Sequence, residues 1–424
     1  MEQNVAIINI WVMAITDKRI VIILGGNILN SGIVDYCKTQ NYNVVIVDWS
    51  PNARLKGDLF LCIDVKDKDS IIKALEENGI HSIYGAYSSI DLAVPSVNAI
   101  NKHFGLEYMD DEALANALPK ATMTRIWDEA GLLNRQSKIY SEWNDEIIAC
   151  SQLMKLIFKP NISSSSRGIT IVPQNSSREV IVQAFDKAKA ESFDKKVIIE
   201  EFVEGREFTC DMLGDKFGNV SVYAISVKYH TVNTSNNKIA IKLHYNSDFY
   251  PDSVYEKIAE VGKRCYRALG FKSSLGHLEI LMKDDGTLSP VEIGARSSGF
   301  ITNPLVSLAS GQDYFADYLR VINGGQIENV DHINGQHSSM YFFYDMPHRT
   351  CVKNPCTLMD FLPEGIVSEY HNRTKILQTG FEFNDITNDN ERVGYEIIHG
   401  ERHLMNIHTI EAAEQEFIHR NTEK

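Results

Sequence analysis

The feature that most constrains the fold is an alternation of short apolar runs with amphipathic stretches between residues 20 and 110. Apolar runs cover residues 20–24 and 44–48, a third begins at residues 82–85, and a helical pattern fills residues 31–39. Strands buried on both faces appear as unbroken apolar runs, which is typical of parallel sheets. The sequence therefore predicts an N-terminal α/β domain built of parallel βαβ units.

A glycine pair, Gly25 and Gly26, follows the first apolar run. Such a turn is part of the dinucleotide-binding fingerprint, but the complete G-x-G-x-x-G pattern is absent here. A tight turn from strand to helix is the favoured interpretation, and nucleotide binding at this turn is the less favoured one.

The overall charge restricts the partners of the protein. Its 424 residues carry 42 Lys and Arg against 56 Asp and Glu, a net charge of −14 at pH 7 with neutral histidines. This balance argues against a general nucleic-acid binder and against adsorption to an anionic membrane, because both partners are themselves anionic. Small anionic ligands stay open, since a few lysines and arginines in a cleft overrule the global sign.

Cysteine usage and the lack of a long apolar run bear on the compartment. The seven cysteines are scattered, and none forms a C-x-x-C pair. This pattern favours reduced thiols over a disulfide framework or a zinc site. No apolar run reaches the roughly 20 residues that span a bilayer, and residues 5–15 lack the basic start and the cleavage site of a signal peptide. We expect a cytoplasmic protein of two or three domains.

Beyond residue 115 the pattern changes to strands joined by polar turns, with helical periodicity returning at intervals. Helical stretches cover residues 120–133, 251–269 and 410–419, and Asn323, Gly324 and Gly325 form a candidate linker. The last hundred residues are rich in strand patterns. These changes predict three domains, at residues 1–115, 116–323 and 324–424.

Residues 156–172 form the first stretch with chemical content. A predicted strand carries Lys159, Pro160 ends it, and four serines at 163–166 lead to Gly168 and another strand. Small residues let backbone N–H groups approach a phosphate chain, serine hydroxyls add donors, and the lysine adds positive charge. An exposed polar hairpin with a lysine at its edge explains the same residues equally well.

Residues 197–211 form the second stretch. A strand leads into Glu200-Glu201-Phe202-Val203, a turn follows at Glu204-Gly205, and a second strand carries Glu207. The backbone between strand and turn can bond an adenine edge, and a nearby carboxylate can accept ribose hydroxyls. A hairpin with solvated glutamates is the alternative.

Residues 276–296 form the third stretch, a predicted hairpin with its turn at residues 284–286. The two strands carry Glu279 and Glu292 among apolar residues, and Arg296 follows four residues later. Two carboxylates that face inward from a sheet are costly unless a cation lies between them. Hard oxygen ligands near phosphates favour Mg²⁺. Arg296 is placed to neutralise a transferring phosphoryl group, and a surface Arg–Glu pair is the alternative.

In this order, the three stretches resemble the ATP-grasp superfamily of carboxylate–amine ligases. The resemblance covers residues 20–323 and includes a lysine before a helix, Lys-Pro with a small-residue loop, Glu-Glu-Phe-Val-Glu-Gly-x-Glu, and Glu followed by Glu-x-x-x-Arg. Glu292-Ile-Gly-Ala-Arg296 and His277-Leu-Glu279 are most similar to bacterial L-amino acid ligases that make dipeptides. Residues 392–400 resemble the closing hairpin of many such ligases.

The resemblance implies an ATP-grasp fold of mixed α/β and α+β class. A parallel βαβ domain at residues 1–115 precedes a two-lobed ATP-binding region at 116–323 and a C-terminal α+β lid at 324–424. It also implies ATP and Mg²⁺, or Mn²⁺ in its place, as cofactors.

Matching residues take the roles that the resemblance implies. Lys120 and Lys159 contact phosphates, Glu207 accepts the ribose hydroxyls, Glu279 and Glu292 bind the metal, and Arg296 and Lys159 are catalytic. The phosphate loop and the adenine hinge complete the nucleotide site; they comprise Ser164, Ser165, Ser166, Glu200, Glu201, Phe202 and Val203.

Two departures from the superfamily pattern concern the region after the second glutamate. Many members have asparagine where this chain has Gly294, so the metal shell relies on water or phosphate oxygens. Ser297-Ser298-Gly299 replaces a turn richer in glycine, which bears on the acceptor pocket.

The resemblance implies an ATP-dependent ligase that joins a small carboxylate to an amine through an acyl phosphate and releases ADP and phosphate. Amino acids are the expected substrates, and a homodimer is a further expectation. An ATP-dependent carboxylase or a carbamoyl-phosphate-synthase-like enzyme stays open, although we expect neither a biotin-carrying Met-Lys site nor a glutaminase partner domain within the chain. A nucleotide-binding protein without turnover also stays open; the retention of Lys159, Glu279, Glu292 and Arg296 argues against it.

Overall fold

The computed structural model describes residues 19–163, 167–232, 238–299, 302–344, 350–386 and 391–422. An N-terminal sheet has the strand order β3-β2-β1-β4, and all its neighbours are parallel. This arrangement confirms the predicted βαβ domain. Its strands and helices are β1 (Ile20–Leu24), η1 (Ile28–Asn30), α2 (Ser31–Thr39), β2 (Asn43–Asp48), β3 (Leu59–Cys62), α3 (Lys68–Glu77), β4 (Gly85–Ser88), η2 (Asp91–Ala93) and α4 (Val94–His103).

The turn after β1 shows why the glycine pair is there. Gly25 has a φ of +108°, which favours glycine, and its N–H donates to the carbonyl of Val47. The N–H of Gly26 donates to the Asp48 carboxylate at 2.7 Å. These bonds tie the turn to β2, as expected of the tight turn that the sequence favours.

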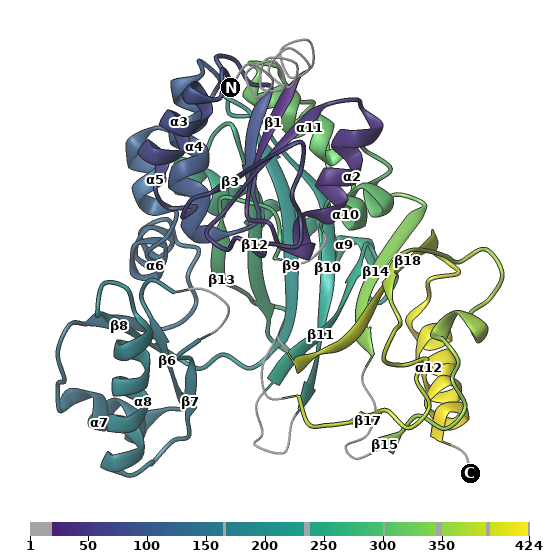
Figure 1. Cartoon of the computed structure of the whole chain (residues 1–424). Helices are drawn as coiled ribbons and strands as arrows, with labels where there is room; N and C mark the ends of the chain where they lie inside the picture. The colour runs from purple at the N-terminus through teal and green to yellow at the C-terminus, as the bar shows by residue number, and fades with distance from the viewer. Residues whose placement is uncertain are drawn as a thin grey trace.

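Two helices lead from the N-terminal sheet into a small lobe, which lies at the lower left in Figure 1. The lobe is a four-stranded antiparallel sheet of order β5-β8-β6-β7. Its apolar face packs on α8 through Phe158, Ile181 and Phe185. The elements are α5 (Asp111–Asn116), α6 (Lys120–Glu129), β5 (Ser137–Tyr140), α7 (Glu146–Leu153), β6 (Leu156–Pro160), β7 (Thr170–Val172), α8 (Arg178–Glu191) and β8 (Val197–Glu201).

The largest element is an eight-stranded antiparallel sheet of order β13-β12-β9-β10-β11-β14-β18-β16. The predicted hairpin at residues 276–296 is its edge pair β12-β13. The strands are β9 (Arg206–Gly214), β10 (Val220–Val232), β11 (Lys238–Tyr245), β12 (Ser274–Met282), β13 (Leu288–Gly294), β14 (His337–Tyr344), β16 (Val367–Asn372) and β18 (Val393–Glu401).

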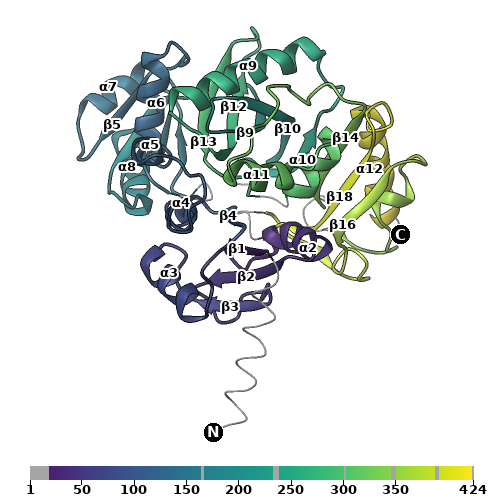
Figure 2. The same cartoon turned by 90° about the horizontal axis from the view of Figure 1, so that it is seen from above.

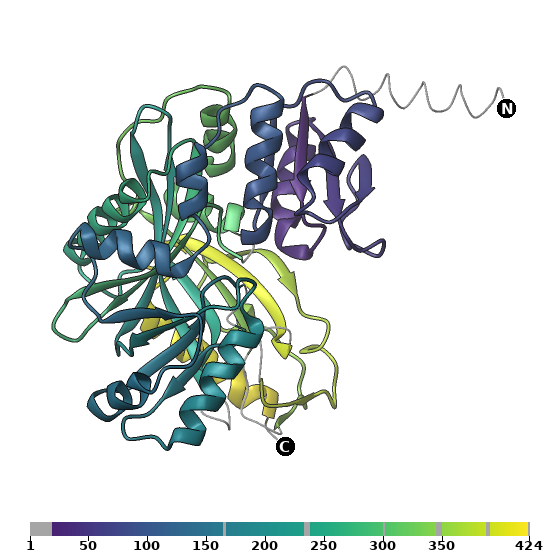
Figure 3. The ribbon, with the colours of Figure 1, turned by 90° about the vertical axis from the view of Figure 1, so that its left-hand side faces the viewer.

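Helices cover both faces of this sheet, as Figure 2 shows. The helix α9 (Asp252–Ala268) packs on the face that carries Met212 and Leu278. On the other face, α10 (Thr302–Ser310) and α11 (Tyr314–Ile322) separate the large sheet from the N-terminal unit, and one apolar core joins all three. Figure 3 shows the N-terminal unit above and the small lobe below.

Most strands after residue 323 join the large sheet, and only the short pair β15 (Thr350–Cys351) and β17 (Glu382–Phe383) forms a separate sheet among the described residues. The strands β14, β18 and β16 extend the sheet begun by β9 to β13, so backbone hydrogen bonds run across the predicted boundary between residues 323 and 324. A separate core lies between this extension and α12. The remaining elements are β15 (Thr350–Cys351), η3 (Leu358–Asp360), β17 (Glu382–Phe383) and α12 (Ile407–Thr422).

The predicted boundary between residues 115 and 116 falls inside α5. Among the described residues, no helix combines the length and the apolar character needed to cross a membrane.

Candidate functional site

The centre of the site is the hairpin β12-β13, where two predicted metal ligands face each other. Glu279 and Glu292 are directly opposite in the antiparallel register, and opposed residues on neighbouring strands point to the same face of a sheet. Their neighbours Leu278 and Ile293 point to the opposite face and are buried against α9. Apolar and acidic residues alternate because one face packs on a helix and the other faces the site.

Lys120, the first residue of α6, contacts the carboxylate of Glu292. Its Nζ lies 2.7 Å from Oε2 of Glu292. Burial would raise the pKa of Glu292, but the ammonium of Lys120 outweighs it and lowers that pKa to about 2. The structure therefore brings together two residues that the sequence placed in the site from positions 172 apart, and Glu292 is ionised at neutral pH.

Lys228 on β10 contacts the carboxylate of Glu279 and also that of Glu207. Its Nζ lies 2.5 Å from Oε1 of Glu207 and 3.1 Å from Oε1 of Glu279. Burial would lower the pKa of Lys228, but the two carboxylates raise it above its usual value. We call Lys120, Glu207, Lys228, Glu279 and Glu292 the hairpin cluster.

The sequence analysis missed Lys228. The available signal was the alternation of Lys228 and His230 near the end of a strand rich in apolar residues, which places both side chains on one face. Nε2 of His230 lies 3.2 Å from Oε2 of Glu207. The predicted ribose acceptor Glu207 is therefore held by two basic side chains from β10.

The small lobe contains a second group of charges. Lys159 at the end of β6 and Arg135 lie 2.5 and 2.9 Å from the carboxylate of Glu200 on β8. Burial would raise the pKa of Glu200, yet Lys159 and Arg135 lower it to about 2. Arg135 also donates to Ser289 Oγ at 3.1 Å and to the carbonyl of Pro290, which ties the lobe to β13. We call Lys159, Arg135 and Glu200 the small-lobe cluster.

This arrangement differs from what the sequence predicted for Lys159. We expected Lys159 either to contact phosphates or to lie at the edge of an exposed hairpin, but its side chain is only 8% exposed and its charge is matched by Glu200. The strand pairing of β6 with β8 causes the difference, because Lys159 pairs with Ile198 and its side chain meets the carboxylate of the neighbouring strand.

The predicted adenine hinge, Glu200 to Val203, starts on the last two residues of β8 and continues just beyond the strand. The backbone N–H groups of Glu201 and Phe202 donate to the carbonyls of Gln136 and Lys155, each at 2.9 Å. The ammonium of Lys155 lies 4.2 Å from the centroid of the Phe202 ring, and Val203 is buried. The segment is thus fixed to the small lobe, at the point where the chain leaves β8 for β9. The predicted phosphate loop at Ser164, Ser165 and Ser166 lies outside the described residues.

Arg296 lies just past the end of β13 and is held by the N-terminal unit. Its Nη2 donates to Oδ2 of Asp91 in η2 at 2.6 Å, and its Nη1 donates to the carbonyl of Ser297 at 2.7 Å. A Cβ on Gly294 would lie 2.9 Å from Oδ1 of Asp91 and 3.1 Å from Cγ of Arg296. Glycine therefore leaves the space that this ion pair fills.

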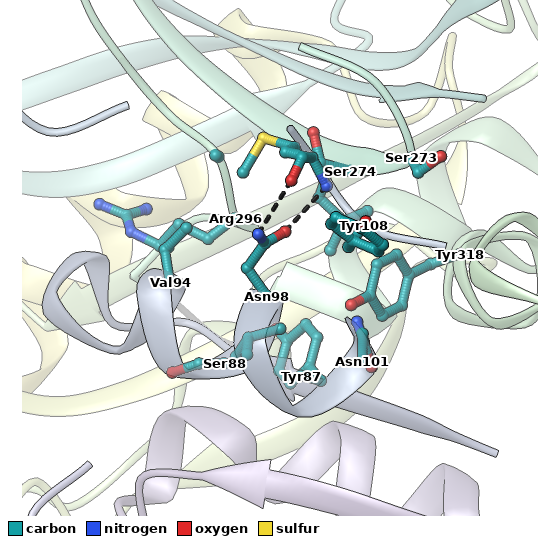
Figure 4. A pocket seen from close by; sticks show the side chains of 14 residues that line it. Tyr87, Ser88, Val94, Asn98, Asn101, Tyr108, Ser273, Ser274, Arg296 and Tyr318 are labelled. Carbon is teal, nitrogen blue, oxygen red and sulfur yellow. Dashed lines mark hydrogen bonds between the residues drawn. The ribbon is translucent and has the colours of Figure 1, made fainter. Parts of the chain in front are cut away.

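A cavity lies beside Arg296, between α4, β4 and the start of β12 (Figure 4). The guanidinium of Arg296 points away from the group formed by Tyr87, Asn101 and Tyr318. The side chain of Asn98 is bonded to the backbone of Met109 at both ends. The cavity thus borders the aliphatic part of the Arg296 side chain, while its guanidinium points away from the tyrosines of the cavity.

Comparison with known proteins identifies the class. The ATP-grasp domain family matches residues 153–303. The predicted resemblance and the predicted fold class are confirmed: the chain contains an ATP-grasp domain and has the ATP-grasp fold.

Individual relatives agree with this class. The D-alanine–D-alanine ligase of Cupriavidus taiwanensis is 26% identical over 221 residues, which are 51% of this chain. The match spans 65% of that relative, just under two thirds of its length. Among solved structures, the L-amino acid ligase from Bacillus licheniformis has a TM-score of 0.72 at 14% identity and covers 95% of this chain and 97% of its own.

A second solved structure is similar in fold. The biotin carboxylase domain of the 2-oxoglutarate carboxylase from Hydrogenobacter thermophilus, solved with MgADP and bicarbonate, has a TM-score of 0.66 at 15% identity. The alignment covers 90% of this chain and 86% of that domain.

Proposed function

We propose that the protein is an ATP-dependent ligase that joins a small carboxylate to an amine, with amino acids as the substrates. The observation that carries the proposal is the convergence of the hairpin cluster with Arg296 on one face of β12-β13. Two lysines contact the two opposed carboxylates there, and the guanidinium of Arg296 is close enough to interact electrostatically with both. Phosphoryl transfer between anions needs such a concentration of positioned charge.

Each group has a task in this reaction. The hinge at Glu201, Phe202 and Val203 holds the adenine, and Glu207 accepts the ribose hydroxyls. Lys120 and Lys159 bind phosphate oxygens, and the loop at residues 164–166 adds donors. These assignments follow the superfamily pattern onto the matching positions.

The donor set fits Mg²⁺. Among the described residues, no three His, Cys, Asp or Glu side chains are placed together to hold a metal ion. Glu279 and Glu292 are instead a pair of hard oxygen donors, and Mg²⁺ is commonly bound through one or two carboxylates plus substrate phosphates. When bound, the ion supplies charge neutralisation to the phosphates.

The reaction proceeds in two steps. A substrate carboxylate attacks the γ-phosphorus of ATP, giving an acyl phosphate and ADP. An amine then attacks the acyl carbon, an amide forms, and phosphate leaves as the amine loses a proton to solvent. Arg296 stabilises the charge that builds on the transferring group, and Asp91 fixes the orientation of its guanidinium.

A product screen tests the proposal. The protein is incubated with ATP, Mg²⁺ and pairs of amino acids, and released phosphate and nucleotide products are measured. We expect phosphate release that requires both substrates, with ADP as the nucleotide product. AMP and pyrophosphate would indicate adenylation and refute the proposal. ADP formation that requires bicarbonate in place of an amino acid would favour a carboxylase.

A further inference from the structure

We propose that Lys120 and Lys228 act as built-in counter-ions, which take the place of the divalent cation in the nucleotide-free protein. Cation binding at Glu279 and Glu292 is then conditional on a nucleotide polyphosphate. The inference rests on the proposed function and adds an order of binding to it. Its basis is that each glutamate already contacts one ammonium group, at 2.7 Å for Glu292 and 3.1 Å for Glu279.

The first step of the argument concerns charge. Two opposed carboxylates on one hairpin repel each other, and the lysines remove that repulsion without a metal. A divalent cation entering the same place would meet two ammonium groups at close range, and like charges disfavour each other. The lysines therefore compete with the cation for the same oxygens.

The second step concerns ligand number. Among the described residues, no three His, Cys, Asp or Glu side chains are placed to hold a metal ion, so a bare cation lacks the oxygen ligands that a dedicated protein cage would supply. A polyphosphate removes both obstacles to cation binding. Its oxygens add ligands for the cation, and they attract the ammonium groups away from the glutamates.

The third step concerns exchangeability. The side chains of Glu279 and Glu292 are 25% and 34% exposed, and those of Lys228 and Lys120 are 12% and 16% exposed. Ligands therefore reach these four groups. By linkage, a nucleotide that raises cation affinity gains affinity from the cation by the same factor, commonly about 5–150-fold.

Mn²⁺ binding to the nucleotide-free protein, followed by electron paramagnetic resonance, tests the inference. We expect weak binding to the natural protein. Lys120→Met and Lys228→Met should each raise Mn²⁺ affinity by about tenfold, because each removes an ammonium group from the carboxylates without adding a ligand. Lys228→Arg keeps the charge and should leave the affinity low.

Two further variants serve as controls. Lys263→Met removes a lysine of similar exposure, 2.7 Å from Asp331 and outside the site, and should not change Mn²⁺ binding. Adding Glu279→Gln to Lys228→Met should abolish the gain. A rise in melting temperature with Mn²⁺, present in Lys228→Met but not in Lys263→Met, gives the same answer if the variant is less stable.

Tight Mn²⁺ binding to the natural protein without nucleotide would overturn the inference. So would unchanged affinity in both lysine-to-methionine variants. Calorimetry with adenylyl imidodiphosphate and Mg²⁺ separates this failure from failure of the proposed function. If the nucleotide binds but the variants do not respond, only the counter-ion role is wrong. If no nucleotide binds, the ligase proposal itself is wrong.

Discussion

The two charged clusters of the ATP-grasp region use the same side-chain chemistry at very different exposure. In the small-lobe cluster, Glu200, Arg135 and Lys159 are 1%, 3% and 8% exposed. In the hairpin cluster, Glu279 and Glu292 are 25% and 34% exposed. Both clusters have lysines beside carboxylates, but only the second is open to solvent.

The difference separates charged groups that stabilise the fold from charged groups that can exchange a protein partner for a ligand. A buried carboxylate between two cations is satisfied by the protein itself, and removing one partner leaves an uncompensated charge. A carboxylate with one lysine and an exposed edge can change partners when a ligand arrives. We infer that Glu200, held by Arg135 and Lys159, maintains the small lobe, with Lys159 also available to phosphate oxygens, and that the hairpin cluster exchanges partners when ligands bind.

The largest expected effect comes from Glu292→Gln. Replacing the Glu292 carboxylate with a neutral amide weakens the proposed metal site. We expect kcat to fall by about 10³-fold, because charge neutralisation by a metal contributes several kcal/mol to such reactions. The melting temperature should change little, since Glu292 is partly exposed. Turnover assays and melting curves on the same variant measure kcat and melting temperature. We expect kcat to recover partly at high Mg²⁺.

The matched variant in the other cluster is Glu200→Gln, and the expected pattern is reversed. Stability should fall by roughly 3 kcal/mol, in the range for breaking a buried charged pair. If Glu292→Gln unfolds easily and Glu200→Gln does not, the division between the clusters is wrong.

The second effect in size concerns Arg296. Arg296→Ala should lower kcat by about 10²–10³-fold, as when one preorganised charge-stabilising donor is removed. ATP affinity, measured by calorimetry, should change little because the lysines and the hinge bind the nucleotide. Arg296→Lys should restore little, since an ammonium cannot reproduce the forked guanidinium. A normal kcat in Arg296→Ala would exclude a catalytic role.

Much of this architecture is predictable from sequence because it depends on local pattern. Unbroken apolar runs indicated the parallel sheet, and alternation around residues 284–286 indicated the hairpin, with Glu279 and Glu292 on its paired strands. The strand β3 was missed, because it is only four residues long and half-exposed.

Long-range pairings were beyond the sequence. No local pattern connects Lys228 with Glu279, Arg135 with Glu200, or Asp91 with Arg296, since each pair comes from different elements. The predicted boundary at 323 followed a glycine-rich turn, but backbone pairing between β11 and β14 continues the sheet past it.

The third effect is a pH dependence of the small-lobe cluster. The neighbouring cations lower the pKa of Glu200 from 4.5 to about 2. A depressed carboxyl pKa contributes stability that is present above pH 4.5 and is lost as the pH falls towards 2. The gap in melting temperature between the natural protein and Glu200→Gln should therefore narrow between pH 4.5 and 2. Glu129→Gln, on an exposed helix surface, is the control and should show no gap at any pH.

The smallest expected effect tests how the N-terminal unit reaches the site, through Gly294→Ala. The new methyl group would lie 2.9 Å from Oδ1 of Asp91 and 3.1 Å from Cγ of Arg296, so the ion pair must shift. A small misplacement of a catalytic group is enough to slow a reaction, and we expect kcat to fall about tenfold with ATP affinity unchanged. Gly335→Ala is the matched control, because its added methyl group would meet only the carbonyl oxygen of Ala309, at an ordinary contact distance of 3.9 Å. Equal kcat values for the two variants would mean that Asp91 does not position Arg296 for the reaction.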